Sequence, residues 1–242
     1  MHLINILNNS MNTQKPLKAD LQESGSLQVY SIFHTIQGEG PFAGTPAMFV
    51  RLAGCNLKCP ACDTQYTGGE TYTPEQLLKA VNARAGKGLA MPKLIVITGG
   101  EPLRQNVHPA VHLLSHNGFH VQIETNGTMP YPVDLYKEQL ISHPTIVCSP
   151  KTSKVHPDLV PLVHSWKYVL EDGYINDRGL PERALQGKTD VWQDLPEGAR
   201  VYVQPIDTDK ISNNFHLAST VSSALTHGYI LCLQVHKIAN LP

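Results

Sequence analysis

The sequence has little charge and few aromatic residues for its length. Charged residues make up 16% and aromatic residues 7% of the 242 residues, and 19 basic side chains nearly balance 20 acidic ones. Without a stripe rich in lysine and arginine, the sequence gives no indication of a surface that binds nucleic acid directly. Hydrophobic residues make up 41%, which excludes an extended disordered chain and allows a sizeable core.

Signals for export and membrane insertion are missing as well. The N-terminal stretch MHLINILNNSMNTQKPLKADLQESGS lacks the basic start and the long apolar run of a signal peptide, and no later run is long enough to span a bilayer. We interpret residues 1–26 as a loosely ordered extension before a single domain over residues 27–242. The five cysteines are an odd number, which argues against a secreted disulfide framework and favours a reducing cytoplasm.

Short β-branched runs alternate with amphipathic runs along the domain. Helices are predicted at 73–86, where Thr73, Pro74 and Gln76 form a capping-box start, and at 107–118 and 212–228, which both end at glycine. Repeated strand–helix units indicate a parallel sheet with right-handed crossovers, and six or seven units favour a partial barrel over a complete eightfold one. Strands are predicted at residues 47–53, 93–97, 119–124, 145–149, 166–170, 200–204 and 229–235.

Polar and glycine-rich segments follow most of the predicted strands. GCNLKCPACDT comes after the first strand of the series, TGGEP after the second, TNG after the third, SPK after the fourth and QPIDT after the sixth. Folds of the α/β class collect their active sites at the carboxyl ends of parallel strands. The sequence therefore predicts one site at this edge of the sheet.

Three cysteines, Cys55, Cys59 and Cys62, lie within eight residues of one another. This spacing suits a [4Fe-4S] cluster, and three ligands leave one iron with an open coordination position. A structural zinc site with Asp63 or a histidine as fourth ligand is one alternative, although paired Cys-x2-Cys knuckles are missing. Inert core thiols are another, which the lysine, asparagine and proline between the cysteines disfavour. The twelve histidines form no metal-binding pattern of their own.

The cysteine motif after the first barrel strand and GGEP after the second resemble the radical S-adenosylmethionine enzymes. This resemblance implies an α/β fold with a partial (β/α)6-type barrel of parallel strands, in which the open [4Fe-4S] cluster loop follows the first barrel strand. It also implies that the open iron binds the amino and carboxylate groups of S-adenosyl-L-methionine. Reduction then cleaves this cofactor to methionine and a 5′-deoxyadenosyl radical.

The ordered set FHTIQGEGPFAGTPAMFVRLAGC, CDT, ITGGEP, ETNGT, SPK and QVHKI is similar to the 7-carboxy-7-deazaguanine synthase family over residues 29–242. This family converts 6-carboxy-5,6,7,8-tetrahydropterin to 7-carboxy-7-deazaguanine with release of ammonia, by Mg²⁺-dependent ring contraction. The product is a precursor of queuosine and other deazapurines. The resemblance implies a pterin substrate, a flavodoxin-like or other reductant and a homodimer, with no membrane or direct nucleic-acid partner.

The resemblance also implies roles for individual residues. Cys55, Cys59 and Cys62 would hold the cluster and Thr64 would ligate Mg²⁺, while the radical chemistry requires no acid or base from the protein. The residues implied to contact the cofactor are Ala61, Asp63, Gly100, Glu101, Glu124, Ser149, Pro150, Lys151, Gln204, Pro205, Ile206 and Asp207. Those implied to contact the pterin are Ile36, Gln37, Gly38, Arg51, Thr98 and Pro242.

Arg51 allows two interpretations. A buried arginine needs an anion, and the substrate carboxylate suits its planar fork. A salt bridge to Glu39 or Glu101 is the structural alternative. Ala61 departs from the family, which often has an aromatic residue against the adenine at this position.

Alternatives remain for other residues and for the function. The segment QGEGP is also typical of a turn. Thr64 could equally be a capping residue instead of a Mg²⁺ ligand. Cys148 and Cys232 are predicted to be buried, unreactive thiols. The rival functions are a glycyl-radical-type activating enzyme and a non-catalytic iron–sulfur or zinc-binding protein.

Overall fold

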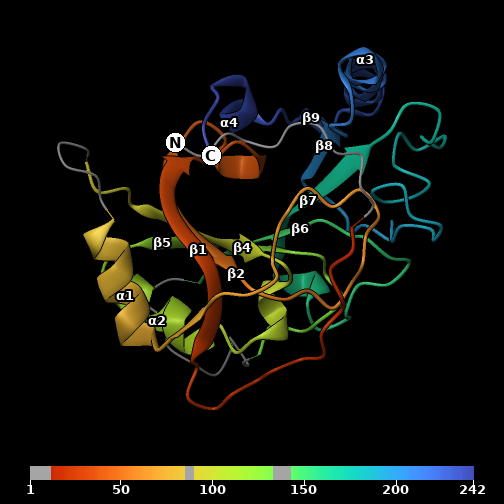
Figure 1. The fold of residues 1–242 in the computed structure, drawn as a ribbon. Coiled ribbons are helices and arrows are strands. Elements are labelled where there is room, and N and C mark those ends of the chain that lie inside the picture. Colours follow the sequence, from red (N-terminus) through yellow and green to blue (C-terminus); the bar gives the residue numbers. More distant parts are fainter. Residues whose placement is uncertain (1–11, 85–89, 133–142) are drawn as a thin grey trace.

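The computed structural model describes residues 12–84, 90–132 and 143–242. The first eleven residues of the predicted extension and the last two of the first predicted helix lie outside these ranges. The elements in chain order are β1 (Leu27–Ile36), η1 (Gly40–Phe42), β2 (Pro46–Leu52), β3 (Glu70–Tyr72), α1 (Pro74–Ala83), β4 (Leu94–Gly99), η2 (Pro102–Arg104), α2 (His108–His116), β5 (His120–Thr125), β6 (Thr145–Cys148), η3 (Val160–Leu162), β7 (Val163–Leu170), β8 (Val201–Pro205), α3 (Lys210–His227), β9 (Ile230–Leu231) and α4 (Val235–Ile238) (Figure 1).

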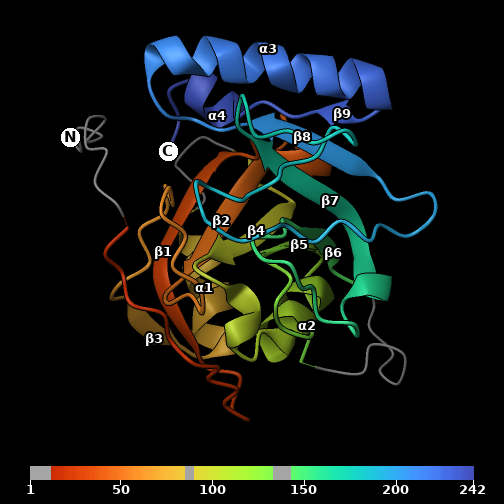
Figure 2. The same ribbon diagram turned by 90° about the vertical axis from the view of Figure 1, so that its right-hand side faces the viewer.

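The strands form one curved sheet in the order β3-β1-β2-β4-β5-β6-β7-β8-β9. From β2 to β9 every neighbouring pair is parallel, whereas β1 is antiparallel to both β2 and β3. The six strands β2 and β4–β8 form the predicted partial barrel, which stays open because β3 and β9 end the sheet on opposite sides. Helices α1 and α2 lie together below the sheet and α3 lies across its other end (Figures 1 and 2).

The two faces of the barrel strands differ in character. On β2, Met48, Val50 and Leu52 are fully buried in the main hydrophobic cluster, which also contains residues of α1 and α2. The alternate residues, Phe49 and Arg51, face the barrel interior and are only partly buried. This period of two follows from strand geometry. The outer face stabilises the fold, at about 1.5–3 kcal/mol per large side chain buried. The inner face begins with a second buried apolar cluster of Ala47, Leu94 and Val96 with Phe42 and Phe49, and becomes polar toward the carboxyl ends of the strands.

The helix ends agree with the predicted signals. Thr73 accepts a hydrogen bond from the Gln76 amide, and the Gln76 side chain accepts one from the Thr73 amide, so the capping box is formed. Helix α3 ends at Gly228, which has a φ of 71°. A left-handed residue at this position satisfies the last carbonyl groups and favours glycine.

Three parts of the fold differ from the prediction. β1 and β3 were not predicted, because β1 mixes polar and apolar residues and its pattern is weak. The strand predicted at 229–235 is wrong beyond Leu231, since Val235 begins α4 and its amide bonds the Gly38 carbonyl. Finally, the expected alternation of strands and helices is interrupted between β7 and β8. Residues 171–200 form no helix there and have one isolated bridge, between Ile175 and Pro181.

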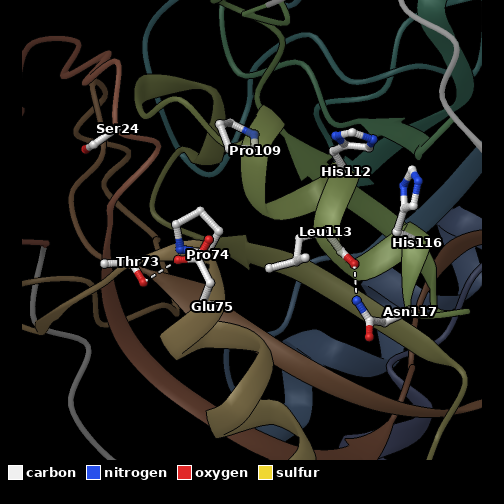
Figure 3. Close-up of a pocket in the computed structure, with 9 residues that line it drawn as sticks. All are labelled: Ser24, Thr73, Pro74, Glu75, Pro109, His112, Leu113, His116 and Asn117. Atoms are coloured by element: carbon white, nitrogen blue, oxygen red, sulfur yellow. Dashed lines mark hydrogen bonds between the residues drawn. The ribbon is translucent and has the colours of Figure 1, made fainter.

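An open groove lies between the start of α1 and helix α2 on the outside of the barrel (Figure 3). Thr73 and Glu75 hydrogen-bond to each other at one side, and the rings of His112 and His116 lie edge to face with centroids 4.5 Å apart at the other. None of the residues predicted to bind cofactor or substrate lines this groove. Among the described residues, no helix is long and apolar enough to cross a membrane.

Candidate active site at the carboxyl edge of the sheet

The three clustered cysteines lie on the loop that leaves β2. All three are free and partly buried, and burial raises the pKa of each thiol, that of Cys55 to about 12. The Leu57 amide donates to Cys55 Sγ over 3.4 Å, and the Cys62 thiol lies 3.7 Å from the Thr64 carbonyl. Metal binding uses the thiolate, so a cluster that binds here must displace three protons.

The donor set of this loop fits an iron–sulfur cluster. Three sulfur donors on one loop are soft ligands, which favour such a cluster over Mg²⁺ or Ca²⁺. In the part of the chain that the structure describes, no three His, Cys, Asp or Glu side chains converge as the ligands of a single metal ion. The cysteines of a cube do not need to converge in this way, because each binds a different iron.

The cysteine loop is fastened by the segment that precedes β1. Residues 12–26 contain no helix or strand, but the Leu17 amide donates to the Cys55 carbonyl over 2.8 Å. The Gln14 side chain accepts from the Tyr66 amide at 2.7 Å and donates to the Thr64 carbonyl at 3.0 Å. The part of the predicted extension that the structure describes therefore supports the loop from outside.

The loop after β4 packs directly on the cysteine loop. The Gly100 amide donates to the Leu52 carbonyl, and the Glu101 amide donates to the Gly54 carbonyl over 3.0 Å. A Cβ atom on Gly100 would lie 2.0 Å from the Gly54 carbonyl oxygen. Only glycine permits this approach of two backbones, so TGGEP fixes the position of the cysteine loop.

Glu101 is fully buried and joins the ends of β4 and β5. Its carboxylate accepts hydrogen bonds from the Leu103 amide at 2.9 Å, the Thr125 hydroxyl at 2.7 Å and the Asn126 amide at 2.7 Å. Burial raises the pKa of Glu101 to about 7, although these hydrogen bonds lower it in part. Both carboxylate oxygens already accept hydrogen bonds from the protein. A hydrogen bond from the ammonium group of the cofactor would therefore be an additional one.

The TNG segment after β5 contacts the cysteine loop through side chains. Asn126 Nδ2 donates to Asn56 Oδ1 over 3.0 Å, and Asn56 Nδ2 donates to the Thr128 hydroxyl over 2.8 Å. Two strand-end loops are thereby joined by a pair of amides. Sequence reasoning did not single out Asn56, which has no distinguishing mark within the motif.

Glu124 is the centre of a polar group inside the barrel. It accepts hydrogen bonds from Gln37 Nε2 at 2.8 Å, Gln122 Nε2 at 2.9 Å and the Thr98 hydroxyl at 3.3 Å. These residues come from β4, β5 and the segment after β1. The structure thus brings Gln37 and Thr98, both predicted to bind substrate, to the same carboxylate.

A buried ion pair between Glu39 and Lys167 lies across the open barrel. The two side chains are 13% and 9% exposed, and Glu39 also accepts from Gln204 at 3.2 Å and Gln234 at 2.8 Å. Burial alone raises the pKa of Glu39, but the Lys167 ammonium outweighs it and lowers the pKa to about 2. Burial lowers the pKa of Lys167, and the carboxylates of Glu39 and Glu124 raise it above its usual value.

Lys151 extends the positive charge toward the cysteine loop. Its ammonium donates to the Ser149 hydroxyl over 2.9 Å, and burial together with the Lys167 charge lowers its pKa. Cys59 and Asp63 are close enough to oppose this shift. The SPK segment after β6 therefore places a cation near the thiols of the cysteine loop, and Pro150 of this segment is buried.

The C-terminal segment packs against the loops of the site. Lys237 Nζ lies 2.7 Å from Asp207 Oδ2 and 3.4 Å from Asp63 Oδ2, so it bridges the loop after β8 and the cysteine loop. A Cβ atom on Gly38 would lie 1.9 Å from His236 Nδ1, which shows how closely the two segments pack. The Thr35 hydroxyl donates to the Pro242 carbonyl over 3.0 Å.

Arg51 forms no salt bridge to Glu39 or Glu101, and the structural alternative for this residue is wrong. Its guanidinium lies 4.9 Å from the centroid of the Phe33 ring, which stacks on Phe49. Glu39 is paired with Lys167, and the Glu101 oxygens accept from β5 and from the loop after β4. Arg51 therefore presents its charge to the barrel interior without a carboxylate from either glutamate.

Ala61 is contacted from the long β7–β8 connection. Its amide donates to the Leu185 carbonyl over 3.1 Å, and Leu185 and Gln186 have φ values of 47° and 58°. Two successive non-glycine residues in this region cost strain. The segment around Leu185 is thus held against the position where the family often has an aromatic residue.

The chain is similar to known proteins along most of its length. The Radical SAM superfamily profile matches residues 50–146. A 7-carboxy-7-deazaguanine synthase from Rhodospirillum rubrum is 40% identical over 92% of this chain and 95% of its own length. The chain belongs to the 7-carboxy-7-deazaguanine synthase family. A Rickettsia prowazekii synthase of this family is 37% identical over 93% of the chain and 94% of its own length.

A solved structure supports the fold independently of these relatives. The chain in the crystal structure of QueE from Escherichia coli superposes with a TM-score of 0.63, covering 86% of this chain and 94% of that one, at 23% identity. Together with the profile match, this likeness confirms the expected radical S-adenosylmethionine fold, with the cysteine loop after the first barrel strand.

The structure gathers the predicted residues at one edge and adds others. Besides those already placed, Ile206 is buried, with its amide on the Leu170 carbonyl, and Pro205 ends β8. Ile36 ends β1 and Pro242 is exposed. Cys148 and Cys232 are buried, as predicted. The contributions that the sequence did not suggest come from Asn56, Gln122, Lys167, Gln234, His236 and Lys237.

Proposed function

We propose that this protein converts 6-carboxy-5,6,7,8-tetrahydropterin to 7-carboxy-7-deazaguanine with release of ammonia, as a radical S-adenosylmethionine enzyme. The observation that supports this most strongly is the match along nearly the whole chain to synthases of that name. The family implies a [4Fe-4S] cluster and S-adenosyl-L-methionine, which supplies the radical when bound. The polar contacts of Glu124 with Gln37, Thr98 and Gln122 inside the barrel are consistent with this proposal.

In this proposal Cys55, Cys59 and Cys62 hold the cluster. The strand ends and loops around it would bind the cofactor, through Ala61, Asp63, Gly100, Glu101, Glu124, Ser149, Pro150, Lys151 and Gln204 to Asp207. Hydrogen bonds of Glu101, Asn56 and Lys237 hold these loops to one another. The protein chain thereby orients the reactants and excludes water, while the cofactor carries the chemistry.

The substrate would lie in the barrel interior, in contact with Ile36, Gln37, Gly38, Arg51, Thr98 and Pro242. Arg51 is suited to the pterin carboxylate, because neither nearby glutamate neutralises it. Thr64 would contribute one ligand to Mg²⁺, which takes most of its ligands from water and substrate. The Thr64 side chain is only partly buried, and its hydroxyl donates a hydrogen bond to Asp63 Oδ1 at 3.3 Å. Two oxygen atoms that could bind a metal ion therefore lie close together.

A one-electron donor such as a flavodoxin-like protein would reduce the cluster. The need for reduced thiols and for this donor fits a cytoplasmic enzyme. The family resemblance also favours a homodimer. No direct nucleic-acid partner or membrane partner is part of the proposal.

Replacing Arg51 with methionine is expected to raise the KM for the pterin about 100-fold, because a charged, two-pronged hydrogen bond to the carboxylate is lost. Arg51→Lys should recover part of this loss, since an ammonium cannot form the fork. The melting temperature should change little, because Arg51 neutralises neither Glu39 nor Glu101. Steady-state kinetics under anaerobic conditions measure the effect.

An analogue of the pterin without the 6-carboxylate provides the matched control. Wild-type protein should bind the analogue about as weakly as Arg51→Met binds the true substrate, and the variant should not distinguish the two compounds. If Arg51→Met still prefers the carboxylated compound by the wild-type factor, another residue binds the carboxylate.

The proposed function is tested by anaerobic incubation of the reconstituted protein with dithionite, S-adenosylmethionine and the pterin, with and without Mg²⁺. We expect 7-carboxy-7-deazaguanine by mass spectrometry, in larger amount with Mg²⁺. Cleavage of S-adenosylmethionine while the pterin stays intact would leave the radical chemistry in place and refute the substrate. An intact cluster with neither reaction would favour a non-catalytic protein.

A further inference from the structure

The loop that carries the three cysteines has no regular structure of its own. Residues 53–69 contain no helix or strand, so no ladder of backbone hydrogen bonds fixes Cys55, Cys59 and Cys62 in relation to one another. A loop that becomes ordered only when it binds a ligand loses affinity to the entropy of that ordering. What holds this loop in place therefore decides in part how tightly it can bind a cluster.

The segment before β1 bonds the loop at two of its cysteines. The Leu17 amide donates to the Cys55 carbonyl over 2.8 Å. The side-chain amide of Asn12 donates to the Cys59 carbonyl over 3.2 Å, and its backbone amide donates to the Pro60 carbonyl over 3.1 Å. Figures 1 and 2 show this segment, in red, beside the orange loop. The segment thus satisfies carbonyl groups that a neighbouring strand would satisfy in a sheet.

Gln14 holds the loop just after the third cysteine. Its side-chain oxygen accepts hydrogen bonds from the Tyr66 amide at 2.7 Å and the Thr67 hydroxyl at 3.1 Å, and its side-chain nitrogen donates to the Thr64 carbonyl over 3.0 Å. The Thr64 carbonyl is also the group that lies 3.7 Å from the Cys62 thiol. One glutamine side chain therefore fixes the backbone that follows Cys62.

Tyr66 closes the loop against the same segment. Its side chain is buried, and its hydroxyl accepts from Asn12 Nδ2 at 3.0 Å and donates to the Leu57 carbonyl over 3.4 Å. Its backbone carbonyl accepts from the Gly54 amide at 2.8 Å, so the two ends of the loop meet at this residue. Asn12 Oδ1 also accepts from Gln14 Nε2 at 3.2 Å, and the two side chains orient each other.

The segment itself is anchored to the loop after β4. The Asp20 amide donates to the Arg104 carbonyl over 2.7 Å, and Arg104 Nη1 donates to the Lys18 carbonyl over 2.9 Å. Arg104 is 5% exposed and also donates from Nη2 to the Ala53 carbonyl over 3.2 Å. Arg104 therefore joins the segment to the end of β2, and a buried part of the fold supports the contacts with the cysteine loop.

We propose that residues 12–20 form a clamp that holds the three cysteines in position before the cluster binds, with Asn12 and Gln14 as its positioning residues. This role rests on the proposed function, since the ligand is the [4Fe-4S] cluster of that enzyme. None of these hydrogen bonds uses a cysteine sulfur atom, so all of them can form in the cluster-free protein. The apparent affinity for a ligand is proportional to the fraction of the protein in the binding arrangement. A clamp that raises this fraction raises the affinity for the cluster by the same factor.

The first test measures amide hydrogen exchange in the cluster-free, full-length protein. Gln14→Leu should raise the exchange rate of residues 55–67 about 10-fold or more, because three hydrogen bonds are lost, and should leave the amides of β4 and β5 unchanged. A general loss of stability would instead raise exchange in the sheet as well. Gln22→Leu is the matched control, because Gln22 is an exposed glutamine of the same N-terminal stretch outside the clamp. It should leave the loop unchanged.

The second test measures iron release from the reconstituted holoprotein to a ferrous chelator under reducing, anaerobic conditions. Gln14→Leu should release iron about 10-fold faster than wild type, and Gln22→Leu should match wild type. Gln14→Glu keeps an acceptor for the Tyr66 amide but cannot donate to the Thr64 carbonyl, so its rate should lie between those of wild type and Gln14→Leu.

Three results would overturn the inference. If the wild-type loop exchanges as fast as an unfolded chain, the cluster orders the loop and the clamp does not. If Gln14→Leu matches wild type in exchange or in iron release, Gln14 does not position the loop. If Gln22→Leu has the same effect as Gln14→Leu, the effect is not specific to the clamp. Because exchange is measured without cluster, cofactor or substrate, a protein that forms no product would refute the proposed function and leave the clamp to be judged by its own test.

Discussion

The variant Cys59→Ala is expected to lose the iron–sulfur cluster and to form no detectable product, a fall of at least roughly 10³-fold in rate. Removing one of three thiolates leaves a cube with two protein ligands, and without the cluster no radical forms. The backbone of the loop should persist, because TGGEP and residues 12–26 hold it independently of the Cys59 side chain. Iron and sulfide analysis, electron paramagnetic resonance of the reduced protein and product mass spectrometry measure the effect.

Cys148→Ala is the matched control for this prediction. Cys148 is fully buried in β6 and belongs to the hydrophobic core. Its replacement should reduce stability by about 1–2 kcal/mol through the small cavity and leave the iron content unchanged. The assignment of the ligand loop is refuted if Cys59→Ala retains its cluster, or if Cys148→Ala loses the cluster to the same extent.

The second large effect is expected for Lys167→Met, which should lower the free energy of unfolding by about 3 kcal/mol or more. The substitution leaves Glu39 buried without its counter-charge, and breaking a buried pair costs more than the pair itself contributes. The double variant Glu39→Gln with Lys167→Met should recover most of the loss, because glutamine can still accept from Gln204 and Gln234. Chemical denaturation of the three proteins measures both effects.

The pH dependence of the same pair has a definite sign. The pKa of Glu39 in the folded protein, about 2, lies below its ordinary 4.5, so the folded state holds this proton more weakly than the unfolded chain. Its contribution to stability is therefore complete above pH 4.5 and is lost as the pH falls toward 2. Lys167→Met should flatten the acid unfolding curve in that window. An unchanged curve would show that Glu39 does not depend on the lysine.

The sequence predicts the central part of this fold and site well. The barrel strands are short apolar runs, and motifs at their carboxyl ends must meet at one edge of a parallel sheet. The cysteine spacing and TGGEP needed only the chain order to be placed together. Sequence reasoning therefore works for the strands and for the motifs that directly follow them, because these depend on residues that are close together in the sequence.

Contacts between segments that are far apart in the sequence could not be predicted from local sequence patterns. Lys167 lies in an apolar strand, and its partner Glu39 is 128 residues away. Lys237 bridges Asp63 and Asp207 from a segment predicted as strand, and its charge alone resembles that of any surface lysine. The approach of Leu185 to Ala61 depends on the path of residues 171–200, which show no helical or strand periodicity.

The central claim is tested most directly by counting the products of one anaerobic reaction of the wild-type protein. The account predicts equal amounts of 7-carboxy-7-deazaguanine and ammonia, in many-fold excess over the enzyme, with S-adenosylmethionine largely unconsumed. This result requires that cluster, cofactor and pterin meet in one site. Formation of 5′-deoxyadenosine without loss of the pterin would contradict the account.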